Sequence, residues 1–414
     1  MNFQVSTLLA ALSKVSPIVN KNSPTPILGD VLIKVKDGLA ILTGTSLRTE
    51  VSVACPVDDA VDGEALCVSV ARLLLVLRTI DGEAVTIKPL APAKRDAGSH
   101  VYQLSCGKAK FRLVGRPPED FALMEKKANT IAVSVNEGEF RKAVTEVAYA
   151  MASHDVRAYL NGILIEATAT EVRVVASDGH RIAKAVVPVN APLSTNDDLP
   201  AGTFSRIVDQ EVVRGLLLRA LDPKGGEMRI RVSPTLIEFE SASLRFTSLL
   251  LEGRYPAYER VIPAQTEINI NVNRVDLLTM VTRADILMGG GKDAVRVQLQ
   301  FKDGALEVSA QNETGENYVE EMDIDYVGPD ARTTYNVNYL IDALSNRSEE
   351  TLCFGIDSAH PGQVSRALLT SDASAGFAAV VMAMRDAPAP APVQAPAPAA
   401  AVSAAQDEEE AVAA

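Results

Sequence analysis

The sequence has 414 residues, of which 47% are hydrophobic and 22% are charged, and its formal net charge is −13. This length suffices for two to four domains, and the composition is that of an ordinary globular protein. No stretch approaches the ~18 apolar residues of a membrane span, and the start at Met1 lacks the basic and apolar parts of a signal peptide. We therefore expect a cytoplasmic protein.

The predicted elements repeat along the chain. Three segments begin with a short alternating strand that leads into an amphipathic helix, at residues 3–15, 131–147 and 268–281. A second helix is expected in each segment, at residues 70–79, 206–220 and 338–346. Alternating strands lie between the helices, with turns predicted at Asp37-Gly38, Asp81-Gly82 and Asp303-Gly304. Repetition about every 130 residues predicts three similar α+β domains.

We place these domains at residues 1–128, 129–264 and 265–386. The composition changes after Asp386, where the chain becomes almost entirely Ala and Pro before an acidic run at residues 407–410. Such a composition cannot bury a core, so residues 387–414 are predicted to be a disordered tail.

Residues 171–184 predict a β-hairpin. Apolar residues alternate along both arms, and Asp178-Gly179 between them is a strong signal for a tight turn, in which both central residues need positive φ. A purely structural turn rarely needs a histidine and an arginine directly after it. His180 and Arg181 therefore indicate a functional role for this hairpin.

Catalysis is the first function to weigh for this hairpin. Ser177, Asp178 and His180 supply the residue types of a nucleophilic triad, but neighbouring strand residues face opposite sides, and a triad is normally assembled from distant segments. The sequence has neither a Gly-x-Ser-x-Gly elbow nor a phosphate-binding loop. Its four cysteines lack Cys-x-x-Cys spacing, and its four histidines lack metal spacing. We therefore expect that the protein is not an enzyme and that it binds no metal and no cofactor.

A family resemblance rests on several motifs in order. Met-Ala-Ser-His-Asp-Val-Arg-Ala-Tyr-Leu-Asn-Gly at 151–162, followed by Ser-Asp-Gly-His-Arg-Ile-Ala at 177–183, resembles the middle domain of the bacterial DNA polymerase III β subunit, the sliding clamp family. Three further stretches resemble other parts of that family, at residues 26–45, 251–263 and 380–385. The resemblance covers about residues 1–386.

The resemblance implies a fold and a function. Each chain would have three clamp domains, with helices lining a central hole and antiparallel sheets outside, and two chains would close head-to-tail into a ring. Such a ring encircles duplex DNA without sequence preference and tethers the replicative polymerase and other replication and repair proteins, which confers processivity. A separate ATP-driven loader opens it.

The resemblance also implies a groove that binds short partner peptides of the Gln-Leu-x-Leu-Phe type, from the polymerase and the loader. Apolar residues would hold the peptide's Leu and Phe, while Arg181 and Arg260 would hold polar groups at the rim. Without the resemblance, Met382 and Met384 are more simply core residues of an edge strand. The implied groove residues are Leu160, Ser177, Gly179, His180, Arg181, Ile182, Pro256, Arg260, Val261, Val380, Met382 and Met384.

A DNA surface must be reconciled with the net negative charge, which by itself argues against DNA binding. A ring can be acidic outside and basic inside, because binding depends on where the charges lie. Basic residues on predicted helices could equally be solvated, and a scaffold that never meets DNA remains an alternative. The implied DNA contacts are Lys21, Asn22, Arg78, Arg141, His154, Arg157, Tyr159 and Arg206.

The same resemblance implies a homodimer in which the first domain of one chain meets the third domain of the other. Ile286 and Leu287 would supply the apolar part and face the region of Phe111. Basic residues of the first domain would meet acidic residues of the third. The implied interface residues are Lys108, Lys110, Phe111, Arg112, Ile286, Leu287, Glu320 and Glu321.

Overall fold

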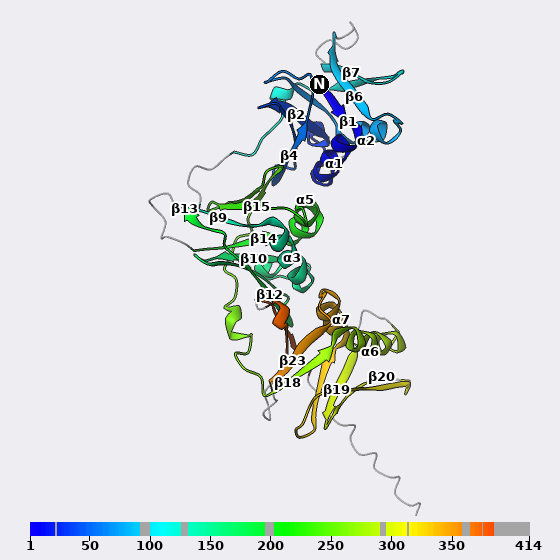
Figure 1. Ribbon diagram of the computed structural model, residues 1–414, viewed down its shortest axis with the longest axis vertical. Coiled ribbons are helices and arrows are strands. Elements are labelled where there is room, and N and C mark those ends of the chain that lie inside the picture. The colour runs from blue at the N-terminus through cyan, green and yellow to red at the C-terminus, as the bar shows by residue number, and fades with distance from the viewer. Residues whose placement is uncertain are drawn as a thin grey trace, which may run out of the picture. The chain divides into compact units, whose positions relative to one another are not determined.

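Three successive stretches of the chain fold on one plan, each with two helical segments and two groups of antiparallel strands (Figure 1). The computed structural model describes residues 1–20, 23–91, 100–125, 131–194, 203–289, 295–312, 314–357, 365–374 and 376–384. The predicted tail at 387–414 lies outside these ranges. No helix among the described residues is long and apolar enough to span a membrane. The three-domain α+β plan is as predicted, while the domain boundaries drawn from the sequence stay predictions.

Two sheets lie within single domains. The first-domain sheet contains, in spatial order, β1 (Asn2–Gln4), β6 (Ala84–Leu90), β7 (His100–Cys106) and β8 (Ala109–Gly115). The third-domain sheet contains β21 (Asn317–Asp323), β20 (Ala305–Gln311), β19 (Arg296–Lys302) and β22 (Ala331–Asn336). Strands β8 and β21 are therefore outermost strands of their sheets.

The other two sheets each cross from one domain to the next. One contains, in spatial order, β13 (Ala191–Ser194), β9 (Ile131–Asn136), β15 (Glu227–Val232), β16 (Leu236–Glu240), β17 (Leu244–Leu249), β4 (Thr49–Pro56), β3 (Leu39–Thr45), β2 (Asp30–Lys36) and β5 (Ala65–Ser69). The other contains β14 (Phe204–Asp209), β10 (Gly162–Ala167), β11 (Glu171–Ser177), β12 (Arg181–Pro188), β25 (Ala378–Met382), β24 (Arg366–Thr370), β23 (Thr351–Asp357) and β18 (Ile268–Asn273). The β17–β4 pairing joins the first and second domains, and the β12–β25 pairing joins the second and third.

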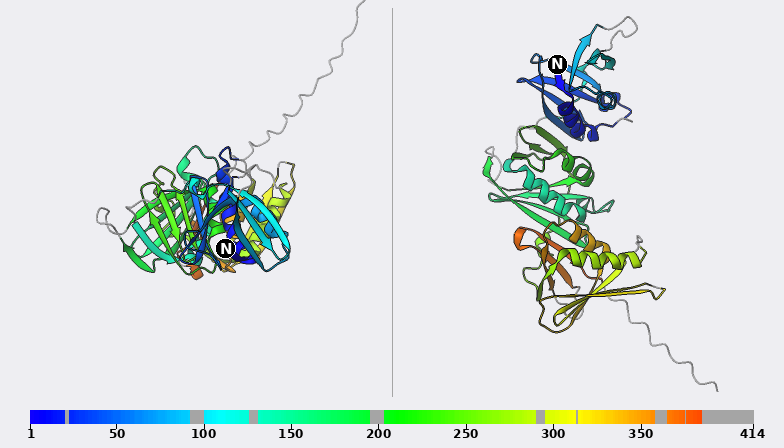
Figure 2. Two further views of the ribbon diagram at one scale, coloured as in Figure 1. Left: turned by 90° about the horizontal axis from the view of Figure 1, so that it is seen from above. Right: turned by 45° about the vertical axis from the view of Figure 1, so that its right-hand side comes forward.

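Five helices begin within two residues of their predicted starts. The first helix of each domain is α1 (Val5–Val15), α3 (Glu137–Val147) or α6 (Arg274–Leu287). The second helices of the outer domains are α2 (Val70–Arg78) and α7 (Val337–Ser345). Asn136, Asn273 and Asn336 cap α3, α6 and α7, because each side-chain oxygen accepts from a free N–H of the first turn. In the third domain α6 packs beside α7 (Figure 2).

The second helical segment of the middle domain differs from its prediction. Residues 206–209 belong to β14, and the helix begins only at α4 (Gln210–Val212). It continues through a π-helical turn, η7 (Val213–Leu217), into α5 (Leu218–Ala220). Asp209 ends the strand and caps the helix, since its side chain accepts from Glu211 N at 2.8 Å. Arg206 is thus a strand residue.

Two of the three predicted Asp-Gly turns join paired strands. Asp37 (φ 51°) and Gly38 (φ 73°) both take positive φ between β2 and β3, as a two-residue hairpin requires. Asp303-Gly304 also joins two paired strands, β19 and β20, but there only Gly304 takes positive φ, at 77°. The third prediction is wrong, because Asp81-Gly82 connects α2 to β6 and no hairpin forms there.

Candidate functional site

A small apolar cluster lies where the second and third domains meet, separate from the main core, and we call it the Leu160 cluster. Its buried members are Ala152, Leu160, Leu164, Val175, Ile182, Ile207, Tyr255, Tyr258 and Val380, and Met382 packs against them half-buried. Ile182 of β12 and Val380 of β25 are paired directly across the domain boundary. Most of the cluster therefore belongs to the second domain, and Val380 and Met382 are contributed by the third.

The structure brings several predicted groove residues into this cluster. Leu160, Ile182 and Val380 are almost completely buried within the chain, so they form its floor. Val261 remains 38% exposed at the surface. Met384 is half-buried, and its backbone N–H donates to Thr334 O at 2.7 Å.

The predicted hairpin is present as β11 and β12, but its turn is longer than expected. Ser177 pairs with Ile182, which leaves four residues in the loop, and Gly179 takes φ 91°. Asp178 has no positive φ, so the turn is not the two-residue type that the sequence predicts. Side chains close it instead: Ser177 Oγ donates to Arg181 O at 2.8 Å, and Asp178 Oδ1 accepts from His180 N at 2.9 Å.

Arg181 lies differently from its predicted place at the groove rim. Its side chain is only 11% exposed and forms ion pairs with Asp178 at 3.0 Å and with Asp342 of α7 at 2.6 Å. Arg181 Nη2 also donates to Tyr149 O at 3.0 Å. The guanidinium is therefore held within the chain, across the boundary between the second and third domains.

The loop that precedes Leu160 carries three predicted DNA contacts and lies against the hairpin turn. Arg157 forms a two-pronged pair with Asp155, at 2.9 and 2.8 Å, and also donates to Asp178 O at 3.3 Å. These hydrogen bonds lower the pKa of Asp155 to about 2. His154 takes φ 58°, which is unusual for a residue with a Cβ. This short loop is thus fixed by its own ion pair.

The connector between the second and third domains, residues 251–263, is held at two points in its second half. Tyr258 Oη donates to Glu166 of β10 at 2.9 Å, and Arg366 of β24 donates to Val261 O at 3.2 Å. Burial is the main cause that raises the pKa of Tyr258. Pro256 and Arg260 of the predicted groove are exposed on this connector.

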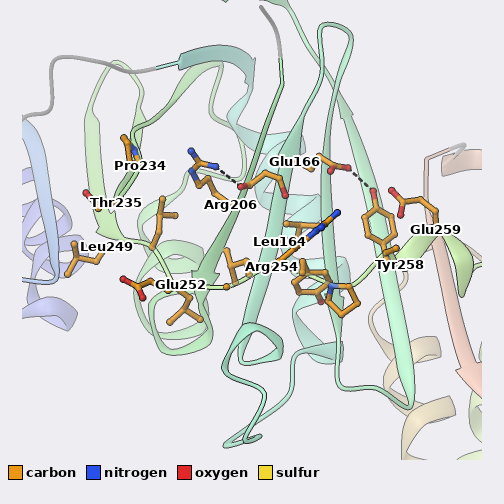
Figure 3. A pocket seen from close by; sticks show the side chains of 18 of the residues that line it. Leu164, Glu166, Arg206, Pro234, Thr235, Leu249, Glu252, Arg254, Tyr258 and Glu259 are labelled. Carbon is orange, nitrogen blue, oxygen red and sulfur yellow. Dashed lines mark hydrogen bonds between the residues drawn. The ribbon is translucent and has the colours of Figure 1, made fainter. Parts of the chain in front are cut away.

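A cavity of about 880 Å³ lies between the connector and the face of β10 and β14 (Figure 3). Its lining includes Arg48 of the first domain, Arg206 of β14 and Arg254 of the connector. Leu164, Ile207, Tyr255 and Tyr258 line it and also belong to the Leu160 cluster. Sequence analysis missed this cavity, because its walls come from segments far apart in the chain.

The remaining predicted DNA contacts have unlike surroundings. Arg78 is exposed at the end of α2, whereas Arg141 on α3 donates through Nε to Leu218 O at 3.2 Å. Arg206 donates to Ser233 O at 3.3 Å and to Ser205 O at 2.8 Å. Lys21 and Asn22 lie outside the described residues.

The outermost strands β8 and β21 carry five of the eight predicted interface residues. On β8, Lys110 and Arg112 are exposed and Phe111 is half-buried; Lys108 is exposed just before the strand. Ile286 at the end of α6 is 70% exposed, and Leu287 is half-buried. On β21, Glu320 pairs within its own domain with Arg283 at 2.6 Å, and Glu321 lies 3.9 Å from Lys302. Sequence analysis missed Leu75 on α2 and Val319 on β21, which are 66% and 60% exposed.

These strands complete a regular pattern. Among the described residues, each domain has eight strands once β13, which only the second domain has, is left out. The fourth strand of the first domain (β4) pairs with the last strand of the second domain (β17). The fourth strand of the second domain (β12) pairs in the same way with the last strand of the third (β25). The fourth strand of the third domain is β21 and the last strand of the first is β8, and each has an unpaired edge among the described strands.

Comparison with known proteins gives one family throughout. The models of the N-terminal, central and C-terminal domains of the DNA polymerase III beta subunit match residues 1–125, 134–257 and 259–385. The beta sliding clamps of Pseudomonas aeruginosa and Escherichia coli K12 are each 28% identical to this chain, over 92% and 91% of it and 98% and 97% of their own lengths.

Solved structures agree. A crystal structure of the Pseudomonas aeruginosa DNA polymerase III subunit beta matches with a TM-score of 0.80 at 28% identity, covering 93% of this chain and all of that one. A second structure from that organism, bound to griselimycin, matches with a TM-score of 0.81 at 27% identity, covering 93% of this chain and 99% of that one.

Proposed function

The chain belongs to the DNA polymerase III beta subunit family, and we therefore infer that it is a DNA sliding clamp. A homodimeric ring encircles duplex DNA and tethers the replicative polymerase, which confers processivity. The clamp is a processivity factor and catalyses no reaction, and a clamp loader acts on it as a separate partner.

The observation that most directly supports ring closure is that β8 and β21, at the two ends of the domain series, each have an unpaired edge among the described strands. Fourth-to-last pairing joins β4 to β17 and β12 to β25 within the chain. The same pairing between chains would join β21 to β8 of the partner. Because both ends are used in each chain, two such contacts close the ring and leave neither edge free for filament growth.

The helices support the same contact. Within the chain, α1 of the first domain contacts α5 of the second, so a first helix meets a second helix at a boundary. By that rule α6 would meet α2 of the partner subunit, which would cover Ile286 and Leu75. Lys108, Lys110 and Arg112 would face the acidic strand β21, and such complementarity favours the correct register. Glu320, already paired with Arg283, would take a smaller share than Glu321.

We propose that the Leu160 cluster is the floor of a groove for a partner peptide. The Leu and Phe of a Gln-Leu-x-Leu-Phe peptide would pack on Leu160, Ile182, Val261, Val380 and Met382. Half-buried Met382 is suited to this, because its flexible thioether adapts to different apolar anchors. Ser177, Gly179 and His180 would form one wall, and Pro256, Arg260 and Met384 the other.

The DNA contacts are proposed to go to phosphates without reading bases. Exposed Arg78, His154 and the neighbouring Tyr159 suit that role. The guanidinium groups of Arg141, Arg157 and Arg206 already donate to partners within the chain, so these arginines would contribute less. Lys21 and Asn22 remain sequence-based proposals, as do the domain boundaries and the cytoplasmic location.

Three measurements test this function. Sedimentation should give the mass of a dimer, and a monomer at micromolar concentration would contradict ring closure. Once loaded, the protein should stay on closed circular duplex and be lost when the circle is linearised. Direct affinity for a short duplex should be weak and should fall with salt, since only phosphate contacts are available. Tight binding to one preferred sequence would refute the clamp.

A further inference from the structure

The guanidinium of Arg181 has every nitrogen engaged inside the chain. Nε donates to Asp178 Oδ2 at 3.0 Å, Nη1 to Asp342 Oδ2 at 2.6 Å, and Nη2 to Tyr149 O at 3.0 Å. These partners come from the hairpin turn, from α7 of the third domain and from η5 (Ala148–Ala150), the short 3-10 helix that follows α3. A fork with fixed donors matches three such acceptors at once, which the single ammonium of a lysine cannot do.

Two aromatic rings flank the same group. The central carbon of the Arg181 guanidinium lies 4.6 Å from the centroid of the Tyr339 ring and 5.3 Å from that of Tyr149. The His180 ring stacks on Tyr339, with centroids 6.1 Å apart and planes 20° apart. Tyr339 and Asp342 both belong to α7, so one helix of the third domain contacts the turn through two consecutive residues, His180 and Arg181.

The turn is closed by hydrogen bonds of its own side chains. Asp178 accepts from the backbone N–H groups of His180 and Arg181, at 2.9 and 3.1 Å, while its other oxygen takes the Arg181 guanidinium. Ser177 Oγ accepts from Gly179 N at 3.1 Å. The Arg181 guanidinium therefore joins α7 to Asp178, the same side chain that holds the backbone N–H groups of the turn.

We propose that Arg181 and Asp342 are positioning residues for the peptide groove, rather than ligands of the peptide. The ion pair between them holds the Ser177–His180 wall against α7, so that the groove is complete only while this pair links the second and third domains. This inference rests on the proposed function, because it concerns the same groove.

Asp342→Asn tests the proposal at a residue that no groove assignment includes. The substitution keeps the shape of the side chain and removes its charge, and Asp342 is 44% exposed, so the fold should tolerate it. Calorimetric titration with a Gln-Leu-x-Leu-Phe peptide should show affinity about fivefold weaker than that of the wild-type dimer. Asp276→Asn on α6 removes one exposed charge from the same domain and should bind the peptide like wild type.

Arg181→Lys separates positioning from direct contact. A lysine retains the charge that a peptide ligand would need but cannot join Asp178, Asp342 and Tyr149 O together, so binding should weaken at least as much as in Asp342→Asn. With a peptide whose Gln is replaced by Ala, both variants should show the same fold-loss as with the parent peptide. Combining Arg181→Lys with Asp342→Asn should add little to the larger single loss, because both break one pair.

Three results would overturn the proposal. One is wild-type affinity in Asp342→Asn and also in Tyr339→Leu, which removes the stacked ring. Another is full binding by Arg181→Lys. The third is loss of the effect when the peptide lacks its Gln, which would make Arg181 a peptide ligand. Absence of peptide binding by the wild-type dimer would instead refute the groove itself, so the two failures are distinguishable.

Discussion

The two domain boundaries within the chain use the same backbone pairing but different side chains. At the first boundary β17 pairs with β4, placing Phe246 opposite Val51, and the hydroxyl oxygens of Thr49 and Ser248 lie 3.5 Å apart. At the second boundary β12 pairs with β25, and two arginines cross it with ion pairs: Arg181 to Asp342 at 2.6 Å and Arg347 to Glu146 at 2.9 Å.

Arg347 is a completely buried charged side chain at the second boundary. Its side chain has no exposed surface, its guanidinium carbon lies 3.7 Å from the Phe377 ring centroid, and it contacts both Glu146 of α3 and Glu349. A buried ion pair adds little net stability compared with apolar packing, but it requires one geometry. Pairing of strands alone suffices to join two domains. The added ion pairs fix their orientation where, in our proposal, both domains contribute to the peptide groove.

The contact between chains would be a third boundary of the same kind, and breaking it should give the largest effect. Ile286→Asp combined with Leu287→Asp should convert the dimer to monomers, because two unpaired charges would enter an apolar contact. Sedimentation at micromolar concentration measures this. The control is Val275→Asp, which places a charge at a different exposed apolar residue of α6, and this variant should remain dimeric. A dimeric double variant would show that the third boundary lies elsewhere.

Arg347→Met should strongly destabilise the second boundary. It takes the nearer, buried cation from Glu146, which keeps only the half-exposed Lys142 at 3.7 Å, and loss of one partner of a buried pair costs about 3–5 kcal/mol. Urea unfolding measures the change in the free energy of unfolding. Adding Glu146→Gln should recover part of the loss, since it neutralises one of the two carboxylates, Glu146 and Glu349, that Arg347 pairs with. At the first boundary Thr49→Ala should cost less than about 1.5 kcal/mol, and equal costs at the two boundaries would contradict the comparison.

Substitutions at the second boundary should weaken peptide binding, whereas substitutions at the first boundary should not. Met382→Ala and Ile182→Ala should each weaken binding of a Gln-Leu-x-Leu-Phe peptide by about 1 kcal/mol or more, because apolar anchors in such grooves carry most of the affinity. Val51→Ala at the first boundary should lower the unfolding temperature while peptide affinity stays at the wild-type value. Calorimetric titration of folded dimers decides this, and a loss of affinity in Val51→Ala would count against the assignment.

The smallest expected effect is a pH dependence at Glu146. Burial raises the pKa of this carboxyl above its usual value, and attraction to Arg347 offsets only part of that. A raised pKa means that the folded state binds the proton more tightly than the unfolded state does. This contribution to stability is therefore complete below the unfolded pKa, near 4.3, and is lost as pH rises through the folded value.

Glu146→Gln removes this titration. The free energy of unfolding of the wild type, minus that of the variant, should be larger at pH 4 than at pH 7, by about 1 kcal/mol or less. Denaturant titrations at the two pH values measure this difference. A difference that increases with pH would show that attraction to Arg347 outweighs burial.

Much of the fold follows from local sequence patterns. Strand alternation and helical periodicity predict where α1, α3 and α6 begin, because both depend on neighbours within a few residues. The Asp37-Gly38 turn has a local cause as well, since both residues tolerate positive φ. The second helix of the middle domain was misplaced because Ser205 to Val208 fit either pattern. Pairing of β14 with β10 decided between them, and that partner lies about 40 residues away in the sequence.

The sequence by itself determined the three-domain plan, the family and most apolar residues at the proposed groove, because periodicity and short motifs are enough to identify them. It could not show that Arg181 is held by Asp342, 161 residues later, or that Arg347 enters the core beside Glu146. The sequence alone does not show whether an arginine lies at the rim of a groove or in the protein interior. Only the tertiary structure supplies its partners, and burial together with those partners decides what a charged side chain does.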